Sequence, residues 1–496
     1  MTNSTPFNLL EATIADVHNA LRAGTLTVRQ LVQAYLDRIA AYDKNGPAIN
    51  AIISINNQAL EEADKLDLAL QTSGFIGPLH GIPIIIKDQA DVDGMPTTLG
   101  SVLFKEHRPG RDCTIAARLK KAGAIFLAKS TLGEMGAGDT HGSLFGSTRN
   151  VYDLQRTAGG SSGGSGAAVS ANFCTVGIGQ EGFASIRRPS IWNGIVGMRP
   201  TAGLVSRYGV YAGWPLIHGS LGPMCRTVRD AAYLLDAMVG YDPLDPLTSH
   251  GMGRFPDSYA ALLDDKALEG ARIGVLREPM GFTTEPDSQD FETVTAIFNQ
   301  TVEDLKHAGA IVIDPIMIPD LKVLLATRAA SGEEEEASFA AYMKGSSNPP
   351  YKSRADVKAS PRFTEAMIGV QSRWGRGQQG EVLLAYYKAR NQLMTNMLSV
   401  MADHKLDAIV HKAVEHTPTL IRDGIKKPFV DQKGAPHLNT FLVFTPSVVV
   451  PSAFTQEGLP TGITFLGRPY DDANMLRFAY AYEQATKHRK PPKSTP

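Results

Sequence analysis

The sequence predicts an α/β fold built on a mostly parallel or mixed β-sheet. Short apolar runs of strand type alternate with helical patterns along the chain, as in strand–helix–strand units. The composition is that of a globular protein, with 43% hydrophobic and 20% charged residues. No fixed-period repeat is present, which argues against solenoids and propellers. At 496 residues the chain could hold several domains, although large α/β enzymes often fill this length around one sheet.

The first part of the chain predicts helices followed by alternating elements. Residues 8–41 repeat apolar side chains every three or four positions, and Thr27 is placed to cap the second helix. A strand-type run at 51–55 precedes a helical stretch at 58–70. The alternation then continues, with strands expected within 81–88 and at 125–129, 272–276, 311–315 and 407–411, and helices at 114–124 and 301–310.

The pattern is less regular between residues 245 and 440, where polar and glycine-rich segments interrupt the helices. We expect the four glutamates at 333–336 to form a solvated helix face. The last residues, 486–496, are rich in lysine and proline and are expected to form a loose tail.

Composition and charge exclude several classes of protein. The net charge of −1 and the pI near 6.9 indicate no nucleic-acid or membrane partner. Three scattered cysteines, Cys113, Cys174 and Cys225, suggest neither disulfides nor a zinc site. The chain shows no secretory signal pattern and no apolar run of about 18 residues. We therefore expect a soluble cytoplasmic protein without a metal or cofactor.

A glycine- and serine-rich stretch, TAGGSSGGSGAAV at 157–169, is the most distinctive local feature. Ser162 matches the G-x-S-x-G pattern of a nucleophile elbow, but the preceding residues are polar rather than an apolar strand. A phosphate-binding loop would end in Gly-Lys-Ser/Thr, and this stretch has no lysine. A flexible connector is a third interpretation. A small-residue helix follows directly, so the stretch leads into a packed element.

Polar residues on either side of this stretch add to the pattern. Lys87 ends an apolar strand, and the carboxyl ends of strands face the ligand crevice in open α/β sheets. Downstream, the turn-like segment 179–189 contains Ser185, 24 positions after Ser161. Together these segments resemble the amidase signature family, and the matching blocks occur in the family's order: GPLHGIPIIIKD, RTAGGSSGGSGAAVSA, SIRRPS, GIVGMRPTAGLVSRYGV, SLGPMCRTVRDAA and GLPTGITFLGRPYDD.

The resemblance implies a three-layer α/β/α fold around one large, twisted mixed β-sheet. It implies a single amidase domain over 1–496 that comprises an N-terminal helical region at 1–70, a catalytic core at 71–245, a variable substrate-pocket region at 246–440, a return to the core at 441–485 and the tail at 486–496.

The resemblance also implies the roles of the site residues. Ser185 is the expected nucleophile, Lys87 the base, and Ser161 a bridging serine that follows a cis peptide bond with Gly160. A lysine serves as base only when neutral, and burial favours the neutral form. Ser162 is expected to support the site by a hydrogen bond to Lys87 or Ser161, or to bond the loop backbone instead; for Ser165 we expect only a structural role.

The segment before the nucleophile departs from the family pattern. The family usually has Thr-Asp/Glu-x-Gly/Ala-Gly-Ser, whereas this chain has Gln180-Glu181-Gly182-Phe183-Ala184-Ser185. We expect the oxyanion hole to use the backbone N–H groups of Gly182, Phe183, Ala184 and Ser185. Alanine resists positive φ more than glycine does, so the turn geometry is expected to differ.

Several large side chains are candidates for the substrate pocket or the core. Phe183, Trp192, Trp214 and Trp374 could line an apolar or aryl-binding pocket. Arg187 is expected to form a structural ion pair. Arg188 is either a surface residue or a ligand for a substrate carboxylate.

The expected function is hydrolysis of the acyl C–N bond of a small amide, anilide or carbamate, with water as the second substrate and a monomer or homodimer as the active form. One alternative is the A subunit of a glutamine-dependent tRNA amidotransferase, which works only together with partner proteins. Another is a family member that has lost catalysis and only binds a ligand.

Overall fold

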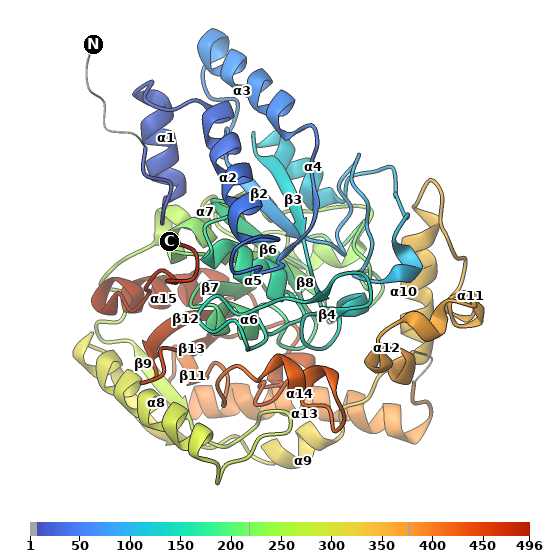
Figure 1. Ribbon diagram of the computed structural model, residues 1–496. Helices are drawn as coiled ribbons and strands as arrows, with labels where there is room; N and C mark the ends of the chain where they lie inside the picture. The colour runs from blue at the N-terminus through green and yellow to red at the C-terminus, as the bar shows by residue number, and fades with distance from the viewer. Residues whose placement is uncertain (1–6, 218, 375–376) are drawn as a thin grey trace.

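The computed structural model describes residues 7–217, 219–374 and 377–496 (Figure 1). Within them an 11-stranded mixed sheet forms the centre, with strand order β1-β3-β2-β6-β8-β7-β12-β13-β11-β9-β10. The strands of this sheet are β1 (Ile52–Ile55), β2 (Pro83–Lys87), β3 (Ile125–Ser130), β6 (Val176–Glu181), β7 (Val196–Arg199), β8 (Ser220–Cys225), β9 (Arg272–Leu276), β10 (Ile311–Ile316), β11 (Ala408–Lys412), β12 (Ser447–Phe454) and β13 (Pro460–Leu466). A separate pair is formed by β4 (His141–Gly142) and β5 (Gly146–Ser147).

Both parallel and antiparallel neighbours occur in the sheet, as expected. Strand β2 lies parallel to β3 and β6, and β9 lies parallel to β10 and β11. The pairs from β6 through β8, β7, β12 and β13 to β11 are antiparallel, as is β1 with β3. All five residues of β2 are buried because helices cover this part of the sheet.

Helices cover the two faces of the sheet and extend beyond it. They are α1 (Ile14–Arg22), α2 (Val28–Tyr42), α3 (Ala59–Ser73), α4 (Thr114–Lys121), α5 (Gly163–Ser170), α6 (Arg187–Trp192), α7 (Val228–Met238), α8 (Gln289–His307), α9 (Leu321–Ala326), α10 (Gly332–Lys344), α11 (Arg354–Ala359), α12 (Ile368–Arg373), α13 (Glu381–Asp403), α14 (Ile421–Ile425) and α15 (Asp472–Thr486). Helices α5 and α6 contact each other and one face of the sheet, while α7, α8 and α15 form the opposite layer. This is the three-layer arrangement that the family resemblance implied.

The expected helix start at Thr27 is confirmed. Its Oγ1 accepts a hydrogen bond from Gln30 N at 3.1 Å, and Gln30 Oε1 accepts one from Thr27 N at 2.9 Å. This reciprocal capping box satisfies two backbone donors that the first turn of α2 would otherwise leave free.

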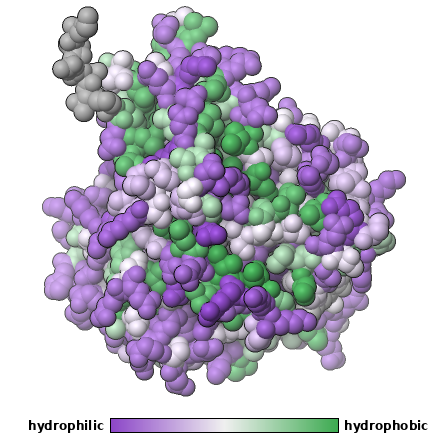
Figure 2. All heavy atoms as spheres, in the orientation of Figure 1, coloured by the Kyte–Doolittle hydropathy of each residue, from purple (hydrophilic) through white to green (hydrophobic). Residues whose placement is uncertain are grey.

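The less regular region forms a helical flank at one end of the molecule. Helices α9 to α13 gather at the lower and right side of Figure 1 and enclose two hydrophobic clusters outside the main core. The four glutamates at 333–336 lie on α10, but they are more engaged than a solvated face requires, since Glu334 accepts a hydrogen bond from Tyr387 and Glu335 pairs with Arg354. In the same orientation, Figure 2 shows apolar residues toward the middle of this face among hydrophilic ones.

The C-terminal residues are packed, contrary to the expected loose tail. Arg489 pairs with Glu11 at 2.6 Å, and Tyr152 donates a hydrogen bond to the carbonyl of Lys490 at 2.6 Å. Thr495 is only 2% exposed. The composition of this segment suggested a loose tail. It could not reveal the contacts, because the partners lie hundreds of positions away in the sequence. No helix in the described parts of the chain has the length and apolar character needed to cross a membrane.

Candidate active site

The parallel pairing of β2 and β6 brings two predicted site residues to the same edge of the sheet. Ile86 of β2 pairs with Ile178 of β6, so the carboxyl ends of both strands lie side by side. Lys87 is the last residue of β2. Ser185 follows the end of β6 after a short turn.

The third residue, Ser161, comes from the glycine-rich stretch before α5. The Gly160–Ser161 peptide bond is cis, as the resemblance implied. A Cβ on residue 160 would lie 2.3 Å from the carbonyl oxygen of Gly138, so only glycine fits there. A Cβ on residue 164 would likewise lie 2.3 Å from Thr131 Oγ1, so a glycine there lets α5 pack close to Thr131. These glycines provide close packing rather than flexibility.

The three side chains form one hydrogen-bonded chain. Ser161 Oγ lies 2.7 Å from Lys87 Nζ and 2.9 Å from Ser185 Oγ. It also lies 2.8 Å from the carbonyl oxygen of Gly136. Because a hydroxyl carries one proton, Ser161 donates to one acceptor at a time and can pass a proton between its two neighbours. Lys87 and Ser161 are fully buried, whereas Ser185 is 8% exposed, so Ser185 is the member of this hydrogen-bonded path that reaches toward solvent.

The surroundings of Lys87 favour its neutral form. Burial lowers the pKa of Lys87 well below its usual value, and the charge of Glu181 opposes this only in part. The adjacent carboxylate, Asp88, pairs with Lys129 at 3.2 Å and accepts hydrogen bonds from Thr98. Lys87 therefore has a hydroxyl and a carbonyl as partners rather than a carboxylate.

A buried ion pair holds the turn that carries Ser185. Glu181 accepts hydrogen bonds from the backbone N–H groups of Ile186 and Arg187, at 2.8 and 3.0 Å, and from Arg187 Nε at 2.7 Å. Burial alone would raise the pKa of Glu181, but the charges of Arg187 and Arg199 outweigh it and the pKa is lowered. Arg187 also donates to the carbonyl oxygen of Phe183 at 2.9 Å. The expected structural ion pair of Arg187 is thus present, and its acid is Glu181.

The backbone before Ser185 presents unused donors. Within the described chain, the N–H groups of Gly182, Phe183, Ala184 and Ser185 have no hydrogen-bond acceptor. None of these four described residues has a positive φ, so the turn accommodates phenylalanine and alanine without the left-handed conformation that we considered for this segment. Donors free of intramolecular partners are what an oxyanion hole requires.

Ser162 and Ser165 both have structural roles, which for Ser162 was one of the two alternatives expected. Ser162 Oγ donates to the carbonyl of Gln180 at 3.1 Å and accepts from its N–H at 3.2 Å. It therefore holds the backbone of β6 and does not bond Lys87 or Ser161. Ser165 bonds Ser130 and the carbonyl of Ile178, which is the structural role expected for it.

Arg188 is neither a surface residue nor a free ligand for a substrate. It is 1% exposed, pairs with Asp139 at 2.7 Å and donates to the carbonyl of Gly160 at 2.8 Å. Burial raises the pKa of Asp139 to about 7, although Arg188 opposes the rise. Arg188 thus holds the carbonyl group of the cis Gly160–Ser161 peptide bond in place.

The aromatic candidates pack against different partners, and none of them lines a pocket found in the described parts of the chain. Phe183 makes edge contacts with Phe282 and His437, at ring distances of 6.3 and 5.8 Å. Trp192 is 1% exposed and stacks on Arg188, so it belongs to the core. Trp214 and Trp374 pack against Arg207 and Arg354, respectively, and Trp374 lies in a cluster with Met135, next to Gly136.

Sequence patterns did not identify several residues that shape the site. Glu181, Asp139 and the Gly136 carbonyl contact the predicted residues directly. Asn439 reaches Glu181 from 258 positions away, at 3.2 Å. No local motif marks such partners, because the contacts depend on how distant segments meet in the fold.

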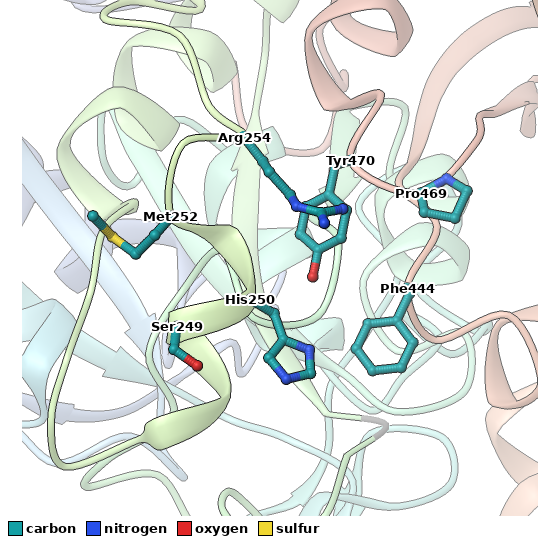
Figure 3. Close-up of a pocket in the computed structure, with 7 residues that line it drawn as sticks. All are labelled: Ser249, His250, Met252, Arg254, Phe444, Pro469 and Tyr470. Atoms are coloured by element: carbon teal, nitrogen blue, oxygen red, sulfur yellow. The ribbon is translucent and has the colours of Figure 1, made fainter.

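A separate surface pocket of about 590 Å³ lies between residues 249–254 and Phe444, Pro469 and Tyr470 (Figure 3). Arg254 lies over the Tyr470 ring there, at 4.5 Å. Its lining includes none of Lys87, Ser161 and Ser185. In the described parts of the chain no group of three His, Cys, Asp or Glu side chains is arranged to hold a metal ion.

One family model and several known proteins match almost the whole chain. The family model described as Amidase matches residues 30–476. A probable amidase of Arabidopsis thaliana is 31% identical over 99% of this chain and 93% of its own length. The A subunit of the glutamyl-tRNA(Gln) amidotransferase of Exiguobacterium is also 31% identical, over 98% of this chain and 99% of its own. The crystal structure of peptide amidase from Stenotrophomonas maltophilia is 33% identical and covers 99% of this chain and 100% of its own, with a TM-score of 0.85. Sequence and fold agree along the whole length, and the chain belongs to the amidase family.

Proposed function

We propose that this chain hydrolyses the acyl C–N bond of a small amide, anilide or carbamate through an acyl-enzyme on Ser185. The observation that carries the proposal is the continuous hydrogen-bonded path Lys87–Ser161–Ser185, which is fully buried at the lysine and slightly exposed at the nucleophile. A serine hydroxyl needs a base to attack a carbonyl near neutral pH, and a neutral buried lysine supplies one.

The first half of the reaction uses this path in one direction. Ser185 Oγ attacks the carbonyl carbon and gives its proton to Ser161 Oγ, while the proton of Ser161 passes to Lys87 Nζ. The oxyanion receives hydrogen bonds from the free N–H groups of residues 182–185. When the C–N bond breaks, the proton of Lys87 returns through Ser161 to the leaving nitrogen, and the amine departs.

The second half uses the same path with water. A water molecule gives a proton through Ser161 to Lys87 and attacks the ester carbonyl of the acyl-enzyme. Collapse of the second oxyanion breaks the bond to Ser185 Oγ, which recovers its proton from Lys87 through Ser161. The acid product leaves, and for a carbamate the product also loses carbon dioxide.

The amidotransferase alternative rests on relatives that are A subunits of glutamyl-tRNA(Gln) amidotransferases and align over nearly the whole chain. Such a protein works only with its partners, so turnover by the purified chain alone separates the two hypotheses. The alternative of a non-catalytic binding protein is less well supported, because every hydrogen bond of the proposed proton path is present.

The test is release of amine from a panel of para-nitroanilides, primary amides, carbamates and hydrazides by the purified chain. Ser185→Ala should abolish turnover, and Lys87→Ala should lose nearly as much, because residues that act as a unit are not additive. Ser73→Ala and Lys65→Ala are matched controls on the exposed side of α3 and should retain activity. Undiminished turnover by Ser185→Ala would contradict the nucleophile assignment.

A further inference from the structure

A cation stands over the aromatic residue next to the nucleophile. Arg328 follows the end of α9, and its guanidinium carbon lies 4.2 Å from the centre of the Phe183 ring. Phe183 precedes Ser185 by two positions in the turn whose N–H groups are free. The fold therefore places a positive charge from the helical flank beside the proposed oxyanion hole.

This charge has no anionic partner in the described chain. Arg187, Arg188 and Arg207 each pair with a carboxylate at 2.7 Å. The side chain of Arg328 makes no hydrogen bond or ion pair with any described residue. Arginines packed against protein normally have such partners, because an unpaired charge is costly to remove from water.

The groups around Arg328 do not neutralise it. His437, the neighbour of Phe183, has a pKa lowered to about 4 by burial and by the charge of Arg328, so it is neutral at physiological pH. The charge of Arg373 acts on Arg328 with the same sign. Phe441 contacts both His437 and Tyr386, which extends the aromatic wall from Phe183 to Tyr386. A second arginine, Arg390, lies over the Tyr386 ring at 5.8 Å. The wall beside the nucleophile is thus aromatic and positively charged.

Arg328 is also accessible from the solvent side. The residue is exposed, yet protein surrounds its charged group closely enough that burial lowers its pKa. Because Arg328 packs on Phe183, two positions before Ser185, a ligand bound to its guanidinium group would lie close to the turn that carries the nucleophile.

We infer that Arg328 binds a carboxylate on the substrate, so that the preferred substrates are amides bearing a negative charge near the scissile bond. This inference rests on the proposed function and narrows its substrate class. The planar guanidinium group suits a carboxylate, which it can bind through two parallel hydrogen bonds. The guanidinium carbon lies over the Phe183 ring, and an arginine held on an aromatic face in this way can still donate its N–H groups to a ligand.

Two matched pairs of substrates test the inference. On the acyl side, succinyl para-nitroanilide is compared with butyryl para-nitroanilide, which has a methyl group in place of the carboxylate. On the amine side, para-acetamidobenzoate is compared with para-methylacetanilide. The wild-type chain should prefer the charged member of one pair, and the pair that responds shows which side of the scissile bond meets Arg328.

Variants then assign the preference to this residue. Arg328→Gln should lower kcat/KM for the preferred charged substrate about tenfold to 100-fold, the range expected for a charge-assisted hydrogen bond, while the neutral substrate changes little. Arg328→Lys should keep part of the preference. Arg422→Gln, at an arginine whose side chain is 75% exposed, is the matched control and should keep all of it. Equal losses for charged and neutral substrates, or no preference in wild type, would overturn the inference.

A binding measurement separates this inference from the proposed function. Calorimetric titration of succinate and of para-acetamidobenzoate into the Ser185→Ala protein needs no turnover. At least one of them should bind, and Arg328→Gln in the same background should remove that binding. If the wild-type chain cleaves no amide but this binding is seen, the proposed function fails and the carboxylate site stands. If neither compound binds and neutral amides are cleaved, the carboxylate site fails alone.

Discussion

Replacing Lys87 by methionine should change the way that stability depends on pH. Methionine has a similar length and no charge. The side chain of Lys87 is fully buried, and burial lowers its pKa in the folded protein, whereas in the unfolded chain the pKa returns to ~10.4. Between these two pKa values the unfolded chain binds more protons at this position than the folded protein does. Stability contributed by Lys87 therefore rises with pH in this window.

The size of the effect follows from the same linkage. While Lys87 is neutral in the folded state and charged in the unfolded state, the wild type gains up to ~1.4 kcal/mol of unfolding free energy per pH unit relative to Lys87→Met. The difference between the two proteins isolates this one group, since all other titrating residues are shared. Urea denaturation followed by the fluorescence of the three tryptophans, from neutral to mildly alkaline pH, measures it.

The two possible results are distinct. The unfolding free energy of the wild type should increase relative to that of Lys87→Met as the pH rises. The turnover of the wild type should rise over the pH range in which Lys87 loses its proton in the folded state. A stability difference that stays constant over this range would show that Lys87 has the same charge in both states. That result would refute the argument that burial prepares the base.

Three further substitutions test the surroundings of the site. Arg187→Met removes the ion-pair partner of the buried Glu181 and should cost about 3–5 kcal/mol of unfolding free energy. Arg422→Met, at an exposed pair, should cost less than about 0.5 kcal/mol, and equal losses would contradict the role of burial. Gly160→Ala places a Cβ 2.3 Å from the Gly138 carbonyl and should cost at least about 1–3 kcal/mol in urea denaturation, whereas Gly332→Ala, with its nearest neighbour at 3.5 Å, should be tolerated. Ser162→Ala removes the acceptor of the Gln180 N–H and should lower the unfolding free energy by about 1–3 kcal/mol. It should reduce turnover far less than Ser161→Ala does, and the reverse order would mean that Ser162 takes part in proton transfer.

The elements of the fold were predictable because they depend on local patterns. The apolar run that ends in Lys87 became β2, and the periodic segment after Thr27 became α2. Ser161 and Ser185 could be identified because each lies in a short block with a characteristic order of residues. The cis geometry of the peptide bond between Gly160 and Ser161 was implied by the same resemblance.

Long-range partners were not predictable, and they account for the differences. Arg188 was expected at the surface or at a substrate. Instead it forms a buried ion pair with Asp139, and no sequence pattern connects these two residues. Ser162 has several acceptors within reach of its loop, and only the position of β6 selects the backbone of Gln180. The contact of Arg328 with Phe183 joins segments that lie more than a hundred positions apart in the sequence.

Labelling of the nucleophile tests the central claim most directly. The purified chain is treated with a serine-directed fluorophosphonate, and the modified peptide is identified by mass spectrometry. A single adduct on Ser185 is expected, because this serine alone joins the buried lysine path to the solvent-accessible side. The adduct should be absent from Ser185→Ala and greatly reduced in Lys87→Met. An adduct on another serine, or an undiminished one in Ser185→Ala, would contradict the proposed mechanism.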